Sequence, residues 1–243
     1  MKKKKTEKTI ETKPIIEALA KISDAITSDQ YIEDILKLIV SVTAEVMDSN
    51  ICSLMLINKE RNELVVKATQ SISERYNKKP NIKIGQGIAG KVAENGKPMT
   101  VLDVCKDERY LSRDVAEKEN LRSLLSVPLI FKNKIIGALN CYTAKIHRFN
   151  KNEINVLKSI ANQSAIVIEN FRLVVETKVI KEELESRKAI ERAKGILMKK
   201  ESINEEEAYE RIRKYSMNNR KSMREVSEAI ILSADIEQKS TDK

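Results

Sequence analysis

Cations that gather near the C-terminus are the residues of this sequence best suited to binding chemistry. The stretch 211–224 contains no acid and holds Arg211, Arg213, Lys214, Arg220, Lys221 and Arg224. The stretch 187–200 has Glu191 as its acid and holds Arg187, Lys188, Arg192, Lys194, Lys199 and Lys200. Acids cluster instead between 201 and 210. Cations segregated in this way can bind phosphates, and the net charge of +9 also suggests a polyanionic partner.

The thiols and the imidazole do not form a recognisable reactive or metal-binding pattern. Cys52, Cys105 and Cys141 lie far apart without C-x-x-C spacing, and His147 is the single histidine. An odd number of cysteines without metal spacing argues against both a disulfide framework and a zinc site. Cys52 and Cys141 lie in apolar runs, where a free cysteine usually packs as a small hydrophobe. The sequence identifies no cofactor.

A glycine motif precedes the second half of the expected sheet. Gly85, Gly87 and Gly90 form the pattern G-x-G-x-x-G, which in a βαβ unit binds dinucleotides. Here no long βαβ unit follows, because the next apolar run begins at about residue 99. We therefore interpret the motif as a turn that opens a short helix over 88–95, ended by Asn95 and Gly96.

Apolar periodicity predicts the elements that position these groups. Steps of three and four residues predict helices over 14–49 and from near Asn150 onward. Short apolar runs predict strands over 51–57, 64–69, 99–104, 124–131 and 134–143. The connection 104–122 is expected to form a helix and a pocket-covering loop. The fold class is therefore α+β, an antiparallel sheet flanked by helices. The basic segment 1–13 and the segment 237–243 are expected to be a disordered arm and a disordered tail.

Residues of about 31–172, within a predicted domain 14–172, resemble a GAF domain. The resemblance is carried by the glycine motif, Ser126-Val-Pro-Leu-Ile, Ile136-Gly-Ala-Leu-Asn and Phe149 followed by Glu153. The resemblance implies a GAF-type sheet with a pocket for a small-molecule ligand, but it does not identify the ligand. Some family members bind cyclic nucleotides through Asn-Lys…Phe-x3-Asp-Glu, but this sequence has Cys141 after Asn140 and Ile154 after Glu153. The separation of Cys141 from His147 also disfavours a bilin.

The segment 166–190 is predicted to be a connecting helix with heptad spacing. Ile166, Asn170, Leu173, Thr177, Ile180 and Leu184 follow each other at alternating steps of four and three. Polar residues at two of these positions can fix the register of a parallel coiled coil. The alternative is a helix that packs back on its own domain.

Three helices are predicted beyond Leu184. Ser202 with Glu205, and Ser222 with Glu225, fit the capping-box pattern at the second and third helix. Tyr215 falls on the apolar side of the second helix, so we expect it in the core; stacking on an unpaired base is the alternative.

Residues of about 184–236 resemble an ANTAR domain, the RNA-binding output module of bacterial transcription antiterminators. The matching residues include Ala193-Lys-Gly-Ile-Leu-Met198, Ala208-Tyr209 and Ile212-Arg-Lys-Tyr-Ser-Met217. The residues expected to bind RNA are Arg187, Lys194, Gly195, Arg213, Lys214, Arg220 and Lys221. Gly195 costs about 1 kcal/mol inside a helix relative to alanine, so it implies close approach of a nucleic acid or of a neighbouring helix.

Together these features predict a ligand- or signal-responsive RNA-binding regulator rather than an enzyme. It would bind hairpins in nascent leader RNA as a homodimer and prevent transcription termination. No apolar run reaches the roughly 18 residues that span a bilayer, and we expect a cytoplasmic protein. The alternatives are a helix-turn-helix DNA regulator, disfavoured by the long joint expected over 217–221, and a GAF-type methionine sulfoxide reductase, whose cysteine spacing is absent.

Overall fold

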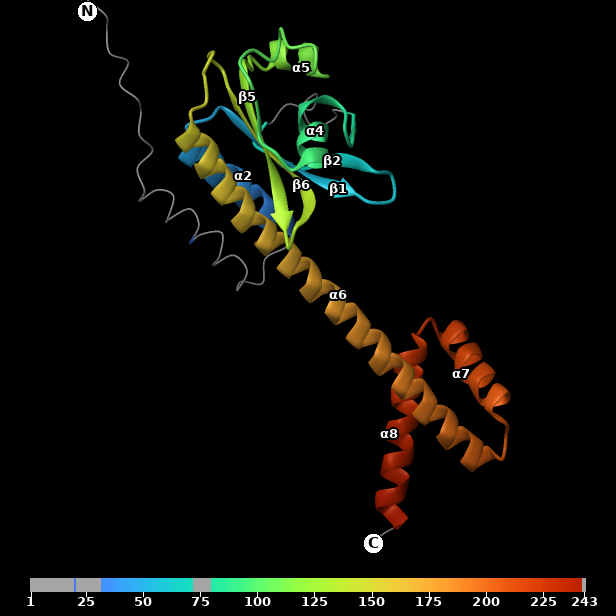
Figure 1. Ribbon diagram of the computed structural model, residues 1–243. Helices are drawn as coiled ribbons and strands as arrows, with labels where there is room; N and C mark the ends of the chain where they lie inside the picture. Colours follow the sequence, from blue (N-terminus) through green and yellow to red (C-terminus); the bar gives the residue numbers. More distant parts are fainter. Residues whose placement is uncertain (1–19, 21–31, 72–79, 242–243) are drawn as a thin grey trace, which may run out of the picture. The chain divides into compact units, whose positions relative to one another are not determined.

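The computed structural model describes residue 20, residues 32–71 and residues 80–241 (Figure 1). The predicted basic arm 1–13, most of 14–31 of the first predicted helix, and residues 242 and 243 of the predicted tail lie outside this range. The chain divides into two compact units. The first ends at Arg172 and the second begins at Leu173.

The first unit is built on an antiparallel sheet of six strands, which confirms the predicted α+β class. The strands are β1 (Ile51–Asn58), β2 (Glu63–Thr69), β3 (Ile82–Lys83), β4 (Met99–Val101), β5 (Ser123–Phe131) and β6 (Lys134–Thr143). Their order across the sheet is β3-β2-β1-β6-β5-β4. The hairpins β1–β2 and β5–β6 were predicted, whereas the two-residue strand β3 was not. Lys132 and Asn133 join β5 to β6 with φ values of 45° and 63°, as a tight hairpin requires.

Two helices cover one face of this sheet, α2 (Ile32–Met47) and the first part of α6 (Lys151–Glu201) (Figure 1). The buried stripe of α2 includes Ile35 and Ile39, which recur at a helical step. Successive strand residues point to opposite faces, so Cys52 and Leu54 join this helix-side core whereas Ser53 and Met55 face away from it. The helix-side core is the largest buried cluster among the described residues.

The opposite face carries α4 (Gly87–Asn95) and α5 (Arg113–Lys118). The glycine motif forms the predicted turn, because Gly85 and Gly87 have φ values of 84° and 61° and α4 begins at Gly87. α4 ends at Gly96, whose left-handed conformation lets its N–H bond the carbonyl of Val92. β4 follows at once and pairs antiparallel with β5. The structure therefore contains the turn and not a dinucleotide-binding βαβ unit.

The second unit contains the rest of α6, α7 (Glu205–Asn219) and α8 (Met223–Thr241). α6 is one continuous helix, which begins at a capping box between Asn150 and Glu153. The core of the second unit is small and consists of Ala193, Leu197, Ala208, Ile212 and Val226. Of the three helices predicted beyond Leu184, the first is the end of α6, and the second and third are α7 and α8.

The cap of α7 differs from the prediction, whereas that of α8 agrees with it. Asn204 and Glu207 form the capping box of α7, with Glu207 N to Asn204 Oδ1 at 2.8 Å. The predicted pairing of Ser202 with Glu205 is wrong, because Glu205 bonds a lysine of α6 instead. At α8, Glu225 N donates to Ser222 Oγ at 3.1 Å and Ser222 N donates to Glu225 Oε2 at 2.8 Å.

Replacing Asn204 with alanine is expected to destabilise the second unit by about 1 kcal/mol, the usual cost of losing an N-cap side chain. Differential scanning calorimetry of the full chain should show the transition of this unit at a lower temperature. Ser233→Ala, at an exposed site within α8, is the control and should leave the transition unchanged. An equally small effect of Asn204→Ala would show that the cap does not stabilise α7.

The part of the chain that the structure describes has neither a membrane-spanning helix nor a metal-binding cluster. No helix there has the combination of length and apolar character that crossing a membrane requires. No group of three or more His, Cys, Asp or Glu side chains there could hold a metal ion.

Candidate pocket and nucleic-acid interface

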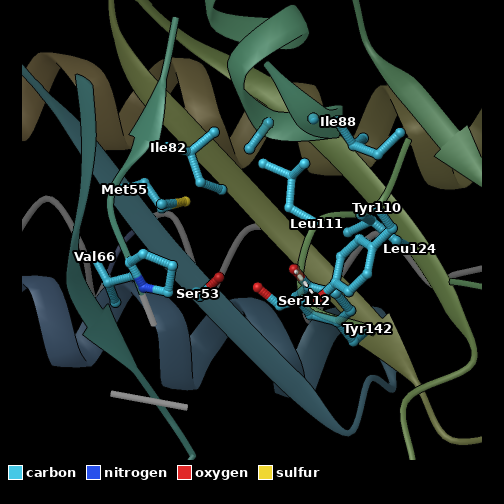
Figure 2. A pocket seen from close by; sticks show the side chains of 13 residues that line it. Ser53, Met55, Val66, Ile82, Ile88, Tyr110, Leu111, Ser112, Leu124 and Tyr142 are labelled. Carbon is cyan, nitrogen blue, oxygen red and sulfur yellow. Dashed lines mark hydrogen bonds between the residues drawn. The ribbon is translucent and has the colours of Figure 1, made fainter. Parts of the chain in front are cut away.

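A small cavity lies in the first unit, on the sheet face that α4 covers (Figure 2). Its walls come from β1, β2, β3, β5, β6, the start of α4 and the segment 110–112, and none of the lining side chains is charged. The lining residues are Ser53, Met55, Val66, Pro80, Ile82, Gly87, Ile88, Ala89, Tyr110, Leu111, Ser112, Leu124 and Tyr142. The cavity volume is about 30 Å³, enough for water but not for a larger molecule.

Hydroxyl groups supply the polarity of this cavity. Figure 2 shows the Ser53 and Ser112 hydroxyls pointing toward each other, beside the two tyrosines. The Tyr110 hydroxyl donates to the Tyr142 hydroxyl at 3.4 Å, and the two rings meet edge to face. Burial raises the pKa of Tyr110 to about 12, so this phenol stays protonated at neutral pH. The cavity thus offers neutral hydroxyls and apolar walls.

The residues that correspond to the cyclic-nucleotide pattern lie elsewhere. Asn140 is buried in the sheet and its Nδ2 donates to Ser53 Oγ at 3.3 Å. Cys141 belongs to the helix-side core. Glu153 accepts from Asn150 N at 2.7 Å and contacts His147 Nε2 at 2.8 Å, so it caps α6. None of these residues lines the cavity.

The structure brings two of the three cysteines together. Cys52 and Cys141 face each other on β1 and β6, with their Sγ atoms 3.0 Å apart in the helix-side core. Burial raises the pKa of the Cys141 thiol, which keeps it protonated and unreactive. Cys105 packs against a different cluster and its Sγ donates to the carbonyl of Leu121. No cysteine lines the cavity.

Lys194, in the second unit, is buried and bound by two carboxylates. Its side chain is 8% exposed, and its Nζ donates to Glu191 at 2.8 Å and to Glu205 at 2.7 Å. Two hydrogen bonds raise the pKa of Lys194, the one to Glu191 most and the one to Glu205 next. The hydrogen bond between Lys194 and Glu205 also lowers the pKa of Glu205. Lys194 therefore joins α6 to the start of α7. Its predicted contact with RNA stays a prediction.

No neighbouring helix of the described chain packs closely against Gly195. A Cβ atom added there would meet no heavy atom within 4 Å. Of the two explanations that the sequence left open, tight packing within the chain is therefore wrong for this structure. Approach of another molecule to the backbone stays a prediction.

Replacing Gly195 with alanine is expected to raise the free energy of unfolding of the second unit by about 0.5 to 1 kcal/mol, because alanine fills open space and favours the helix. The calorimetric transition of that unit should rise by about 4 °C. A lower transition temperature would show that the site has no room for a methyl group. The RNA affinity of the same variant tests separately whether RNA approaches the backbone at Gly195.

The remaining predicted RNA-binding residues differ in their ion pairs. Arg213 donates to Glu210 at 3.0 Å, and Lys221 pairs with Glu225 at 3.2 Å. Arg187, Lys214 and Arg220 are exposed and have no ion pair to another described side chain. Lys214, Arg220 and Lys221 lie at the C-terminal end of α7 and in the turn that follows, with Arg213 one residue earlier. Arg187 and Gly195 lie apart from them on α6.

Exposed apolar groups accompany these cations. Tyr215 is 58% exposed, so its predicted place in the core is wrong. The buried positions of α7 are Ala208, Ile212 and Ser216, which form a narrow stripe beside Tyr215. Met217 is 68% exposed on the same helix. The end of α7 and the turn after it thus combine Lys214 and Arg220, which have no ion pair to another described side chain, with an accessible aromatic ring. The sequence-based list of binding residues omitted this ring.

The turn between α7 and α8 is shorter than expected. α7 continues to Asn219 and α8 begins at Met223, so the turn consists of Arg220, Lys221 and Ser222. Arg220 adopts a left-handed conformation, with φ 52°, and its N–H caps α7. The expected long joint over 217–221 is wrong, and the turn has the length usual in helix-turn-helix proteins. The contrast between RNA and DNA must therefore be tested by binding.

Comparisons with known proteins agree with this architecture. The GAF domain family matches residues 30–169, and the ANTAR domain family matches residues 179–231. The GAF domain of a phosphoenolpyruvate-protein phosphotransferase from Coxiella burnetii has a TM-score of 0.60 at 24% identity, over 68% of this chain and 98% of that chain. The free methionine-R-sulfoxide reductase of Neisseria meningitidis has a TM-score of 0.56 at 20% identity, over 68% and 96%. At these identities the likeness shows the fold.

Curated relatives match the same part of the chain. The phosphoenolpyruvate-dependent phosphotransferase system protein of Escherichia coli is 21% identical over 155 residues, 64% of this chain and 21% of that protein. The methyl sulfide methyltransferase-associated sensor of Methanosarcina acetivorans is 23% identical over 167 residues, 67% and 17%. The chain thus corresponds to about a fifth of the length of these relatives. It belongs to the GAF-domain family and carries an ANTAR domain after its GAF domain.

Proposed function

We propose that this protein is a signal-responsive RNA-binding regulator that prevents transcription termination by binding hairpins in nascent leader RNA. The observation that carries the proposal is the group of cations at the end of α7, within the matched ANTAR domain. Lys214 and Arg220 lie there without ion pairs to other described side chains, beside the exposed ring of Tyr215.

This surface suits a structured RNA loop. Cations contact phosphates and release counterions, which provides affinity and salt dependence. An exposed aromatic ring can stack on a base that a loop displays outside the helix. Arg213 and Lys221 are held by single exposed carboxylates, and such surface pairs are weak enough to yield to a phosphate. Lys194 contributes by fixing α6 against α7.

Gel-shift titrations of the full chain test the nucleic-acid partner. The probes are a leader RNA with two hairpins, the same RNA with one hairpin deleted, and duplex DNA of the same sequence, all at one salt concentration. We expect the two-hairpin RNA to bind tightest and Tyr215→Ala to weaken its binding about tenfold through lost stacking. Tyr209→Ala, at an exposed tyrosine earlier on α7, is the matched control. Tighter binding to duplex DNA would overturn the proposal in favour of a DNA regulator.

The cavity of the first unit is the proposed sensing site. Its uncharged lining favours a small neutral molecule over an anion such as a cyclic nucleotide. Ligand pockets usually measure at least about 300 Å³, so a ligand must displace part of the wall. The segment 110–112 is the candidate, because Leu111 lines the cavity while 57% exposed. We propose that occupancy acts on RNA binding through α6, which runs through both units.

Native mass spectrometry of protein purified from cells that naturally express it tests this part of the proposal. We expect a retained molecule of a few hundred daltons, lost in Ser53→Leu, which removes a hydroxyl and fills the cavity. Lys67→Leu, on an exposed position of β2, controls for the added apolar bulk. Retention of the same molecule by Ser53→Leu would place its site elsewhere.

A homodimer is the third part of the proposal, because two ANTAR domains would then meet the two hairpins of one leader. The apolar side chains of α6 that the structure leaves exposed support it. Leu173, Ile180 and Leu184 are 47%, 64% and 51% exposed.

A further inference from the structure

Three polar side chains form a row across the sheet face that α4 covers. Asn140 of β6 faces Ser53 of β1 on one side and Ser126 of β5 on the other. Side chains directly opposite each other in antiparallel strands have Cβ atoms about 4.5 to 5.5 Å apart, so neighbours in this row lie within reach of one another. Each of the three residues is 2% exposed or less. The row is therefore a buried polar strip beneath α4.

Two oxygen atoms of this row lack a hydrogen bond. Among the residues that the structure describes, Ser126 Oγ and Asn140 Oδ1 are the buried side-chain atoms without a partner. The amide nitrogen of Asn140 donates to Ser53 Oγ at 3.3 Å, which leaves the amide oxygen free. Buried polar atoms are nearly always hydrogen-bonded, because an unpaired one loses its bonds to water and gains none in return. Two such atoms side by side indicate that another molecule completes them.

The row is continuous with the cavity of the first unit. Side chains two residues apart in a strand share one face, so Tyr142 follows Asn140 along β6 and Leu124 precedes Ser126 along β5 on this face. Tyr142, Leu124 and Ser53 all line the cavity (Figure 2). A molecule that enlarged the cavity along the sheet would therefore meet the two free oxygens.

The two oxygens specify the polar group of that molecule. The Ser126 hydroxyl can donate, whereas the amide oxygen of Asn140 can only accept. A ligand that satisfies both presents an acceptor next to a donor, as the C=O and N–H of a lactam or a primary amide do. A carboxylate has no donor, and it would bring a charge into a cavity whose lining is uncharged. A ketone lacks the donor as well.

We infer that the first unit recognises a small neutral amide, whose C=O accepts from Ser126 Oγ and whose N–H donates to Asn140 Oδ1. This inference rests on the proposed sensing site and adds the class of ligand and two side chains that bind it. β5 and β6 supply a fixed polar floor, and the apolar walls pack against the rest of the ligand. The segment 110–112 remains the part of the wall that moves aside.

NMR titration of the full chain with labelled methionine methyl groups tests the class of ligand. Met55 lines the cavity, and its signal is identified by its loss in Met55→Leu. Pyrrolidinone, a lactam, should shift this signal at millimolar concentrations. N-methylpyrrolidinone, whose nitrogen has no hydrogen, and cyclopentanone, which is smaller and has no nitrogen, should each bind at least about fivefold more weakly. Equal affinities for pyrrolidinone and both analogues, or tighter binding of cyclopentanol, would overturn the inference.

Replacing Ser126 with alanine tests the floor of the site. We expect Ser126→Ala to lower the affinity for pyrrolidinone about fivefold, through the loss of one hydrogen bond. The control is Ser164→Ala in the helix-side core, whose hydroxyl already donates to the carbonyl of Ile160 at 2.8 Å; it should leave this affinity unchanged. Ser126→Ala should not lower the calorimetric transition of the ligand-free first unit, because its hydroxyl has no partner to lose. A lowered transition with unchanged affinity would show that a structural water alone completes the two oxygens, which contradicts the inference.

These readouts separate the inference from the proposed function. If pyrrolidinone does not bind but the protein retains a cellular molecule that Ser53→Leu loses, the sensing site stands and the amide class is wrong. If pyrrolidinone binds with the expected selectivity but the chain binds no RNA hairpin, the inference stands and the proposed function fails.

Discussion

Replacing both Lys214 and Arg220 with glutamate is expected to lower the affinity for a two-hairpin leader RNA about a hundredfold at moderate salt. Several other cations of the second unit are paired with carboxylates, such as Arg192 with Asp235 and Lys200 with Glu237. Lys214 and Arg220 have no such partner among the described side chains, so they can meet phosphate without first breaking an ion pair. The substitution removes two contacts and adds two repulsive charges.

Salt titration makes this prediction specific. The slope of log K against log salt should become shallower by about 1.5, because each lost phosphate contact contributes roughly 0.7 to 0.9. The control is Lys59→Glu with Arg61→Glu, in the exposed turn between β1 and β2, which changes the net charge equally. If this control weakens binding as much, the effect is one of overall charge and the α7 surface is not the interface.

Replacing Gly137 with alanine is expected to destabilise the first unit by about 3 to 5 kcal/mol. Gly137 lies in β6 between Leu56 of β1 and Leu129 of β5. A Cβ atom there would overlap the backbone carbonyl oxygen of Met55 and press on the side chains of Leu129 and Leu56. A backbone atom cannot move aside as a flexible side chain can, so the central strands would have to separate.

Calorimetry of the full chain measures this effect, because two units are expected to give two transitions. Gly195→Ala identifies the transition of the second unit by shifting it upward. The transition of the first unit should fall by more than about 10 °C in Gly137→Ala. Lys134→Ala, at an exposed position of the same strand, should shift it little. A shift of similar size in both variants would mean that β6 tolerates a methyl group at Gly137.

Local periodicity predicted most of the fold because burial in this chain follows simple repeats. The apolar runs form strands, and the segments with apolar residues at helical spacing form α2 and α6. The glycine motif was interpreted correctly because the short distance to the next strand left no space for a βαβ unit. Gly137 was noticed as part of a family pattern, but its close approach to Met55 is a contact between strands that the sequence does not reveal.

The candidate site was less predictable because distant partners decide the role of each cation. Ser202 with Glu205 and Asn204 with Glu207 have the same spacing, but Asn204 is the cap of α7 and Glu205 binds Lys194. The same contact withdraws Lys194 from the surface. Tyr215 was assigned to the core because it is close to Ile212 on the helix surface. The buried stripe of α7 is too narrow to include a ring at that position.

The most direct test of the proposed function is terminator readthrough in single-round in vitro transcription. The template carries a leader, taken from transcripts that crosslink to the protein in its natural cells, with two hairpins and a terminator. The account predicts that the full chain increases readthrough, and that the Lys214→Glu, Arg220→Glu variant does not while Lys59→Glu, Arg61→Glu does. Readthrough that is unchanged by the full chain, or raised equally by both variants, would contradict it.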